Sequence, residues 1–273
     1  MLAGDRSLRW ESAVEDLAGS ANGLPARRLV GVGVGPGEAN LITLKAVDVL
    51  RSADVILVPS TERSGTGPGR AESIVLEVCP ELRERIRRVP FSMADRQGVS
   101  PRRAEAWQVS AAAVLEAFDE GAQLVCLATV GDPSVYSTFS YLAAEVEKAL
   151  PQLLTEVVPG ITAMQALAAA SRTALTEGTE VLALVPVTAG MGTVERVLEV
   201  ADTVVLYKAG RQMSAVVEVV RAKRPDDVGL VGTEIGLPDQ SIRPLAEVPE
   251  SETAPYFSTV LVAPVRPTTG GRL

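Results

Sequence analysis

Four short stretches of the sequence place glycine or proline turns beside side chains that could contact a ligand. They are Gly31-Val-Gly-Val-Gly-Pro-Gly37, Gly131-Asp-Pro133, Val158-Pro-Gly-Ile-Thr-Ala163 and Thr203-Val-Val-Leu-Tyr-Lys208. Glycine lets the main chain approach a ligand closely, so backbone groups are expected to make many of the contacts. The chain has no histidine, which excludes Ser-His-Asp and Cys-His nucleophiles and imidazole metal sites. No metal site is predicted, and catalysis by positioning a reactive substrate is favoured.

The first stretch stands between an apolar strand and a helix, which is where a dinucleotide-binding fingerprint would lie. The pattern does not meet that requirement. Pro36 occupies the position of the third glycine, and the acidic residue Asp54 stands at the start of the second strand and not at its carboxyl end. NAD and FAD are therefore disfavoured. A loop that contacts another cofactor is the preferred interpretation, and a turn that needs glycine for backbone reasons alone is the alternative.

The other stretches also have purely structural interpretations. Asp132 follows a buried strand, and ligands of open parallel sheets bind outside the carboxyl ends of the strands. An aspartate beside a proline equally often organises a turn. Thr162 is placed to cap the helix after it, which explains this threonine without a ligand. Tyr207 and Lys208 end a strand and are a weak signal when taken alone.

The elements that must position these stretches alternate in the order typical of an α/β fold with a largely parallel sheet. In the first half we expect strands over residues 29–34, 54–58 and 124–128 and helices over 71–78, 104–119 and 137–150. A further helix begins after Thr43, with Leu44, Val47 and Leu50 on one face. In the second half we expect strands over 181–186, 203–207, 228–232 and 259–263 and a helix over 211–222, which indicates a smaller α+β or mixed-sheet domain. The predicted domains are residues 29–150 and 151–265, between a flexible N-terminal extension over 1–28 and a tail over 266–273.

Composition limits the class of protein further. The formal net charge is −8, from 26 basic and 34 acidic residues, so a nucleic-acid partner is not expected. Cys79 and Cys126 lack the spacing of a zinc site or a disulfide framework and are predicted to be buried thiols of a cytoplasmic protein. The sequence has no apolar run long enough to span a membrane and no secretion signal. We therefore expect neither a membrane partner nor export.

In this order and at these separations, the four stretches resemble those of the tetrapyrrole (corrin/porphyrin) methyltransferases, which use S-adenosylmethionine without a Rossmann fold. The resemblance covers residues 29–265. It rests on Val32-Gly-Val-Gly-Pro-Gly-Glu38 with Leu41-Ile-Thr-Leu-Lys45, on Gly131-Asp-Pro133, on Pro159-Gly-Ile-Thr-Ala163 and on Thr203-Val-Val-Leu-Tyr-Lys208. Glu38 replaces the family's usual aspartate and keeps a carboxylate. Lys208-Ala209 replaces the methionine-glycine pair of the uroporphyrinogen branch, whereas Gly131-Asp-Pro-Ser-Val-Tyr-Ser-Thr-Phe-Ser-Tyr-Leu142, Leu175-Thr-Glu-Gly178 and Gly236-Leu-Pro-Asp-Gln240 match a corrin branch.

The resemblance implies a two-domain tetrapyrrole methylase fold, S-adenosylmethionine bound between the domains, methyl transfer to a tetrapyrrole carbon, and a homodimer. Carried over by motif, the residues expected to contact the cofactor are Pro36, Gly131, Asp132, Val135, Thr162, Ala163, Tyr207 and Lys208. Asp132 and Tyr136 are candidates for accepting the proton that methylation releases. Two alternatives stay open. One is another methylase of this fold, acting on a different tetrapyrrole or, like diphthine synthase, on a protein; the other is a ligand-binding subunit without activity, which the intact loops disfavour.

A tetrapyrrole carries several carboxylates, which guanidinium groups can bind in a bidentate manner. Arg63, Arg70 and Arg96 lie in expected loops and are the candidates for this contact. A second group of arginines alternates with Glu81 and Glu84, a pattern that predicts a solvated helix face instead. This group consists of Arg83, Arg85, Arg87 and Arg88.

Overall fold

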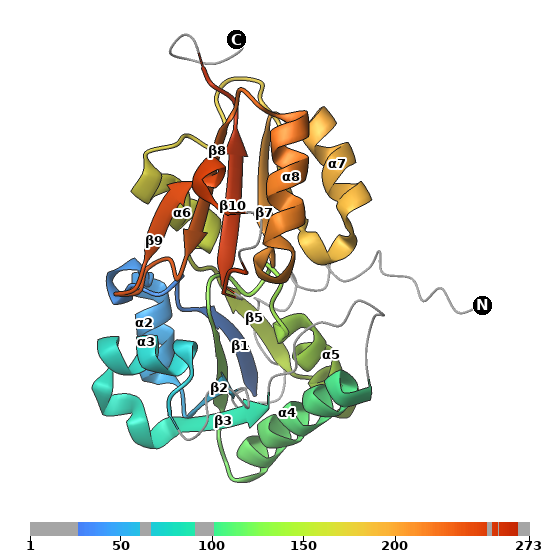
Figure 1. The fold of residues 1–273 in the computed structure, drawn as a ribbon. Coiled ribbons are helices and arrows are strands. Elements are labelled where there is room, and N and C mark those ends of the chain that lie inside the picture. Colours follow the sequence, from blue (N-terminus) through green and yellow to red (C-terminus); the bar gives the residue numbers. More distant parts are fainter. Residues whose placement is uncertain (1–26, 61–66, 91–100, 250–252, 256, 267–273) are drawn as a thin grey trace, which may run out of the picture.

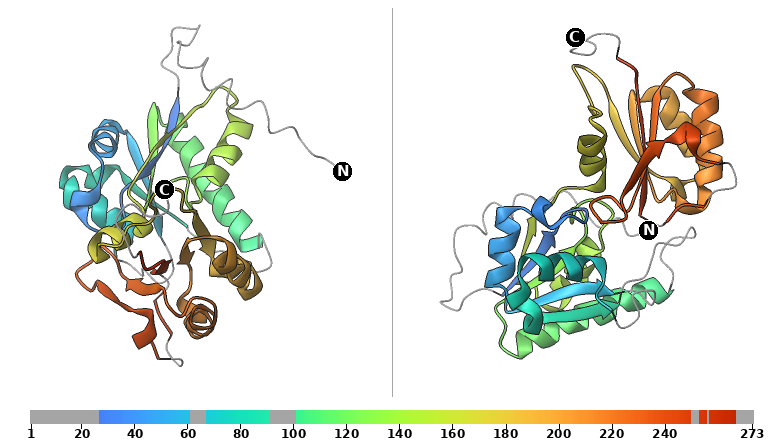
Figure 2. Two further views of the ribbon diagram at one scale, coloured as in Figure 1. Left: turned by 90° about the horizontal axis from the view of Figure 1, so that it is seen from above. Right: turned by 60° about the vertical axis from the view of Figure 1, so that its left-hand side comes forward.

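The structure is a computed structural model, which describes residues 27–60, 67–90, 101–249, 253–255 and 257–266. The chain forms two lobes, each built on a five-stranded sheet (Figure 1; Figure 2). Most of the predicted extension over 1–28 and tail over 266–273 lies outside the described residues. Arg28 opens the first strand, and Arg266 pairs with Glu180 through Nη2 at 2.6 Å.

The sheet of the N-terminal lobe is entirely parallel, with the strand order β3-β2-β4-β1-β5. Its strands are β1 (Arg28–Gly33), β2 (Val55–Ser60), β3 (Ile86–Pro90), β4 (Leu124–Thr129) and β5 (Leu154–Val158). Its helices are α2 (Leu44–Ser52), α3 (Arg70–Val78), α4 (Pro101–Asp119) and α5 (Phe139–Ala149), with short 3-10 helices η2 (Ala39–Leu41) and η4 (Pro80–Arg85). The α/β order predicted for this half is confirmed.

Both faces of this sheet are covered, so its central strands are apolar along their length. Successive strand residues point to opposite faces. Val30 and Cys126 therefore pack under α2 and α3 on one face, whereas Leu29 and Val125 pack under α4 and α5 on the other. Cys79 is also buried, which confirms the prediction for the two free thiols.

The first sheet extends beyond the predicted domain boundary after Leu150. Strand β5 pairs in parallel with β1, from Arg28 opposite Leu154 to Val32 opposite Val158. Strand β5 lies at the edge of the sheet and alternates between half-buried and exposed residues. The chain therefore enters the second lobe only after Val158.

The sheet of the C-terminal lobe is mixed, as predicted, with the order β6-β7-β10-β8-β9. Its elements are α6 (Ala163–Ser171), β6 (Leu182–Pro186), η5 (Val187–Ala189), α7 (Met191–Val200), β7 (Thr203–Tyr207), η6 (Gly210–Gln212), α8 (Met213–Lys223), β8 (Val228–Thr233), β9 (Ser241–Pro244), η7 (Leu245–Glu247) and β10 (Ser258–Ala263). Strand β10 runs antiparallel between β7 and β8. Helices α7 and α8 cover one face of the sheet, and α6 covers the other.

One prediction about side chains in the N-terminal lobe is wrong, and another is confirmed only in part. Leu44, expected on the packed face of its helix, is 85% exposed because it is the first residue after the cap Thr43, whereas Leu50 is fully buried. Arg83 and Arg85 are exposed in the 3-10 helix η4, as predicted, whereas Arg87 and Arg88 lie in strand β3 and not in a helix. Arg87 pairs with Glu120 at 2.5 Å, and other arginines bond to groups of neighbouring elements: Arg88 to Glu72 at 2.7 Å, and Arg85 to the carbonyl groups of Arg51 and Ala53, both at 2.9 Å.

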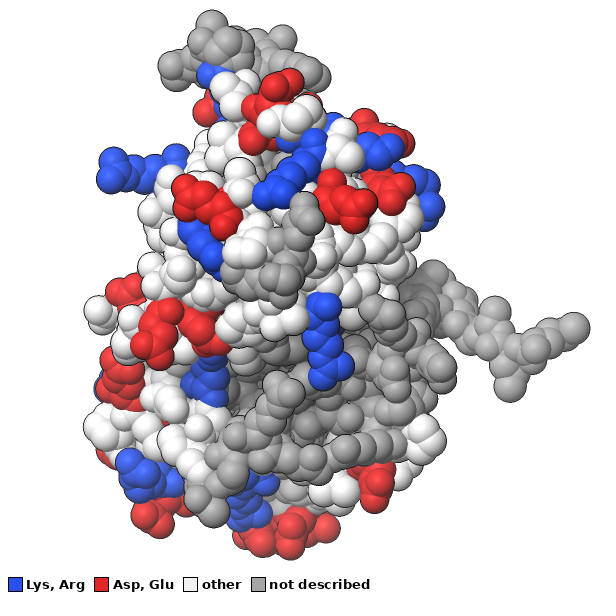
Figure 3. Space-filling model, viewed as in Figure 1, with Lys and Arg blue, Asp and Glu red and all other residues white. Residues whose placement is uncertain are grey.

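On the face seen in Figure 3, basic and acidic side chains are interspersed over the described atoms. Among the described residues, no helix is long and apolar enough to cross a membrane. In the same part of the chain, no cluster of three or more cysteine or acidic side chains could hold a metal ion.

Candidate functional site

The first three motif stretches meet where strands β1, β4 and β5 end. Parallel strands present their carboxyl ends at one edge of the sheet, so the loops that follow them are neighbours. The Gly131 amide donates to the Gly35 carbonyl oxygen at 2.7 Å. A Cβ atom on Gly160 would lie 2.2 Å from the Gly131 carbonyl oxygen, and one on Gly33 would lie 2.6 Å from the same atom. Only glycine fits at Gly33 and Gly160, because backbone packs directly on backbone.

Asp132 fastens the second stretch to the third. Its Oδ1 accepts hydrogen bonds from the amide of Ser134 at 2.7 Å and from the Ser134 hydroxyl, and its Oδ2 accepts one from the Gly160 amide at 2.9 Å. Burial alone would raise the pKa of this carboxyl group, but the hydrogen bonds from Ser134 and Gly160 lower it. Asp132 therefore organises the turn, as predicted, and it also faces the cavity described below.

Thr162 caps helix α6, as predicted. Its hydroxyl oxygen accepts a hydrogen bond from the Gln165 amide at 3.4 Å, and the Gln165 side chain accepts one from the Thr162 amide at 2.9 Å. This reciprocal arrangement is a capping box. In the first turn of α6, the amide of Met164 donates to the hydroxyl of Tyr207 at 2.8 Å, which joins the third stretch to the fourth. Burial raises the pKa of Tyr207.

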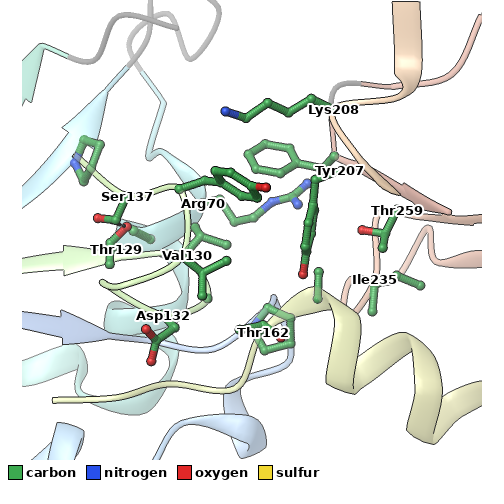
Figure 4. A pocket seen from close by; sticks show the side chains of 18 of the residues that line it. Arg70, Thr129, Val130, Asp132, Ser137, Thr162, Tyr207, Lys208, Ile235 and Thr259 are labelled. Carbon is green, nitrogen blue, oxygen red and sulfur yellow. Dashed lines mark hydrogen bonds between the residues drawn. The ribbon is translucent and has the colours of Figure 1, made fainter. Parts of the chain in front are cut away.

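These contacts surround a cavity of about 460 Å³ between the two lobes. All eight residues predicted to contact a cofactor line it: Pro36, Gly131, Asp132, Val135, Thr162, Ala163, Tyr207 and Lys208. In Figure 4, Thr129, Val130 and Ser137 face Tyr207 and Thr259 across the cavity, with Thr162 at its base. Tyr136 and Arg70 also line it, whereas Arg63 and Arg96 lie outside the described residues.

Three non-glycine residues with left-handed backbone line this cavity. The φ angles are 51° at Tyr136, 60° at Lys208 and 52° at Glu234. Such conformations cost energy and persist where the surrounding structure imposes them, frequently at functional sites. The Lys208 ammonium lies 4.7 Å from the centre of the Tyr136 ring, and that ring stands edge-on to Tyr207 at 5.7 Å. Burial raises the pKa of Tyr136.

Sequence reasoning missed the part of the cavity wall that Glu234 and Phe257 contribute. Arg70, the first residue of α3, crosses to the C-terminal lobe and donates through Nη2 to the Glu234 carboxylate. Its guanidinium carbon lies 3.8 Å from the centre of the Phe257 ring. Burial lowers the pKa of Arg70 to about 10. The available signal for Glu234 was its position two residues before Gly236, just ahead of the stretch already matched to the family.

The comparisons with known proteins extend over most of the chain. A family model described as Tetrapyrrole (Corrin/Porphyrin) Methylases matches residues 28–249. The chain is 30% identical over 245 residues to the precorrin-2 C(20)-methyltransferase of a Sinorhizobium species, covering 88% of this chain and 97% of that protein. It is also 30% identical over 240 residues to the cobalt-precorrin-2 C(20)-methyltransferase of Salmonella typhimurium, covering 86% and 95%.

A solved structure shares the fold. This is the uroporphyrin-III C-methyltransferase from Thermus thermophilus complexed with S-adenosylhomocysteine, with a TM-score of 0.59 and 22% identity. The match covers 86% of this chain and 97% of that one. The two-lobed architecture is therefore common to both chains over nearly their full lengths.

Proposed function

The chain belongs to the tetrapyrrole (corrin/porphyrin) methylase family and is a methyltransferase, and on this basis we propose that it methylates C20 of precorrin-2 or of its cobalt-containing form, cobalt-factor II, in cobalamin biosynthesis. The observation that carries the proposal is that all four motif stretches meet around one cavity between the lobes. The relatives named for C20 methylation match over nearly their whole length, which supports this substrate over others of the family.

The cavity is suited to S-adenosylmethionine as the methyl donor. Its volume is within the range of roughly 300–1,000 Å³ typical of small-molecule sites. Gly131 has a φ of +73°, and the nearest atom to a Cβ placed on it would be the Thr162 Cα at 3.9 Å, so its backbone is open to a ligand. The eight lining residues named by the motifs would hold the cofactor, largely through backbone groups and small apolar side chains such as Ala163. When bound, the cofactor supplies an electrophilic methyl group on a sulfonium.

The substrate would be held by charge and by aromatic contact. Arg70 and Lys208 are cations that line the cavity and can bind carboxylates. A guanidinium has five N–H donors, so Arg70 can hold Glu234 through Nη2 and still bind a substrate carboxylate. The rings of Tyr136 and Phe257 offer flat apolar surface to a macrocycle. Arg63 and Arg96 remain predictions for the same contact.

Catalysis would come mainly from positioning. A meso carbon of a reduced tetrapyrrole is already nucleophilic, so the enzyme has to align it with the methyl group, exclude water and accept a proton. The absence of histidine is then no obstacle. Asp132 and Tyr136 were predicted as proton acceptors, and both line the cavity. We further propose a cytoplasmic homodimer, which rests on the family resemblance and on the two buried free thiols.

The test is incubation of the purified protein and S-adenosylmethionine with metal-free precorrin-2 and, separately, with cobalt-factor II. Mass spectrometry of the tetrapyrrole should show a methyl group in place of one hydrogen for at least one substrate. Gain by one substrate alone would also identify the branch of the pathway. If neither substrate gains mass while the cofactor binds, the C20 proposal is refuted, and methylation of a protein or of another tetrapyrrole becomes the candidate.

A further inference from the structure

Two carboxylates line the cavity within the described residues, those of Asp132 and Glu234. Both oxygens of Asp132 are engaged by Ser134 and Gly160, which it holds together. If Asp132 accepted a proton during the reaction, one of these donors would lose its charged acceptor at a position where the side chain is nearly buried. Asp132 is therefore suited to shaping the site and poorly suited to accepting a proton in each catalytic cycle.

The other titratable groups of the cavity are also poor acceptors. Arg70 and Lys208 have N–H donors and no acceptor when charged. Burial raises the pKa of Tyr136 and also of Tyr207, so both phenols are neutral near pH 7. The hydroxyl oxygen of Tyr207 already accepts a hydrogen bond from the amide of Met164. Among the described residues of the cavity, this leaves the carboxylate of Glu234.

Glu234 is held rigidly at the end of β8. Its amide donates to the carbonyl oxygen of Phe257 at 3.3 Å, and its own carbonyl oxygen accepts from Leu237 at 3.0 Å. Gly236, with a φ of +82°, packs against the first motif loop so closely that a Cβ atom there would lie 2.6 Å from the Glu38 amide. The left-handed backbone at Glu234 is thus imposed by contacts on both sides. These contacts fix the position of the Glu234 backbone relative to the first motif loop.

Arg70 directs the carboxylate of Glu234 into the cavity from the opposite lobe. The side chains of the pair are 15% and 24% exposed, so the ion pair is shielded but open to a ligand. Figure 4 shows Arg70 reaching toward Tyr207 within the cavity. The ring of Phe257 packs against the guanidinium of Arg70. Arg70 engages Oε2 of Glu234, whereas both oxygens of Asp132 are engaged by the loops that Asp132 joins.

We propose that Glu234 is the base that removes the C20 proton, with Arg70 as the residue that positions it. This inference rests on the proposed function. In the reaction, C20 attacks the sulfonium methyl carbon, the C20–CH₃ bond forms as the S–CH₃ bond breaks, and S-adenosylhomocysteine leaves. C20 then carries both a methyl group and its original hydrogen within a cationic conjugated system. An Oε atom of Glu234 takes that hydrogen as a proton, the C–H electron pair restores the neutral π-system, and the proton passes from Glu234 to solvent.

The test compares Glu234→Gln with Glu180→Gln. Glu180 forms an ion pair with Arg266 that is more shielded, with side chains 4% and 14% exposed, and it lies outside the residues that line the cavity, so it controls for the loss of an Arg–Glu pair. We expect Glu234→Gln to lower kcat by roughly 10²–10⁴-fold, and Glu180→Gln to leave kcat unchanged. Calorimetric titration with S-adenosylhomocysteine, which requires no turnover, should give the same Kd for wild type and both variants.

Two further measurements distinguish a catalytic base at position 234 from a residue with a purely structural role. With substrate deuterated at C20, the isotope effect on kcat should be larger in Glu234→Gln than in wild type, because proton removal becomes slower. Glu234→Asp should recover part of the rate, and Arg70→Lys should recover part of the rate that Arg70→Met loses. The proposal is overturned if Glu234→Gln keeps the kcat of wild type. It is also overturned if the loss of kcat only follows a fall in melting temperature and the isotope effect is unchanged. If wild type methylates neither tetrapyrrole, the proposed function fails first, and the role of Glu234 in it fails too.

Discussion

Replacing Gly160 by alanine should damage both the stability and the cofactor affinity of the protein. The added Cβ would lie 2.2 Å from the Gly131 carbonyl oxygen and 2.8 Å from the Gly33 carbonyl carbon, both of them backbone atoms. No side chain can rotate away, so the loops must separate by about 1 Å, an overpacking that typically costs about 1–3 kcal/mol. At roughly 2–4 °C per kcal/mol for a chain of this size, the melting temperature should fall by about 2–12 °C.

The same displacement moves Gly131, which lines the cavity. A misplacement of about 1 Å near the reacting groups can lower kcat by about 10²-fold. Because Gly131 is expected to contact the cofactor, titration calorimetry should show that the variant binds S-adenosylhomocysteine more weakly than wild type. Differential scanning calorimetry should show the lower melting temperature. The matched control is Gly192→Ala in α7, where the new Cβ has its nearest neighbour at 3.7 Å and where alanine favours a helix by about 0.5–1 kcal/mol. Wild-type affinity and melting temperature in Gly160→Ala would refute the reasoning that direct backbone packing shapes this site.

Other substitutions test individual contacts of the site. Thr162→Ala removes the capping box and should lower the free energy of unfolding by about 0.5–2 kcal/mol in urea titrations; an unchanged midpoint would contradict the role of this cap. Asp132→Asn should weaken cofactor binding, because an amide cannot accept from all the donors that the carboxylate serves. Since the pKa of Asp132 is lowered in the folded protein, its contribution to stability is present above about pH 4, its unfolded pKa, and is lost as the pH falls through the folded value. The melting temperature of the variant should therefore depend less on pH in that acidic range than that of wild type. Arg70→Met should raise KM for the tetrapyrrole by about tenfold or more, because charged hydrogen bonds contribute about 1.5–3 kcal/mol; a KM equal to that of wild type would argue against carboxylate binding by this residue.

Local patterns predicted much of the fold. The bounds of β7 agree with the predicted 203–207, because a run of apolar residues there ends at a polar aromatic and a lysine. The caps at Thr43 and Thr162 were also predictable, since a hydroxyl before an apolar helix satisfies free amide groups. Strand β3 was missed because its exposed edge position lets arginines dominate its sequence. Its strand character depends on pairing with β2, which no local pattern reports.

The sequence by itself determined which residues make the loops around the cavity. Glycine and proline at fixed positions limit the backbone to a few turns, and their order along the chain matches one family, so eight residues that line the cavity could be named in advance. Only the tertiary structure brought Arg70 to Glu234, which lies 164 residues later in the other lobe. Their contact depends on how the two sheets face each other, and the residues next to each of them in the sequence do not indicate it. Neighbouring residues determine the conformation of a turn, whereas the arrangement of charges across the cavity depends on how the lobes pack against each other.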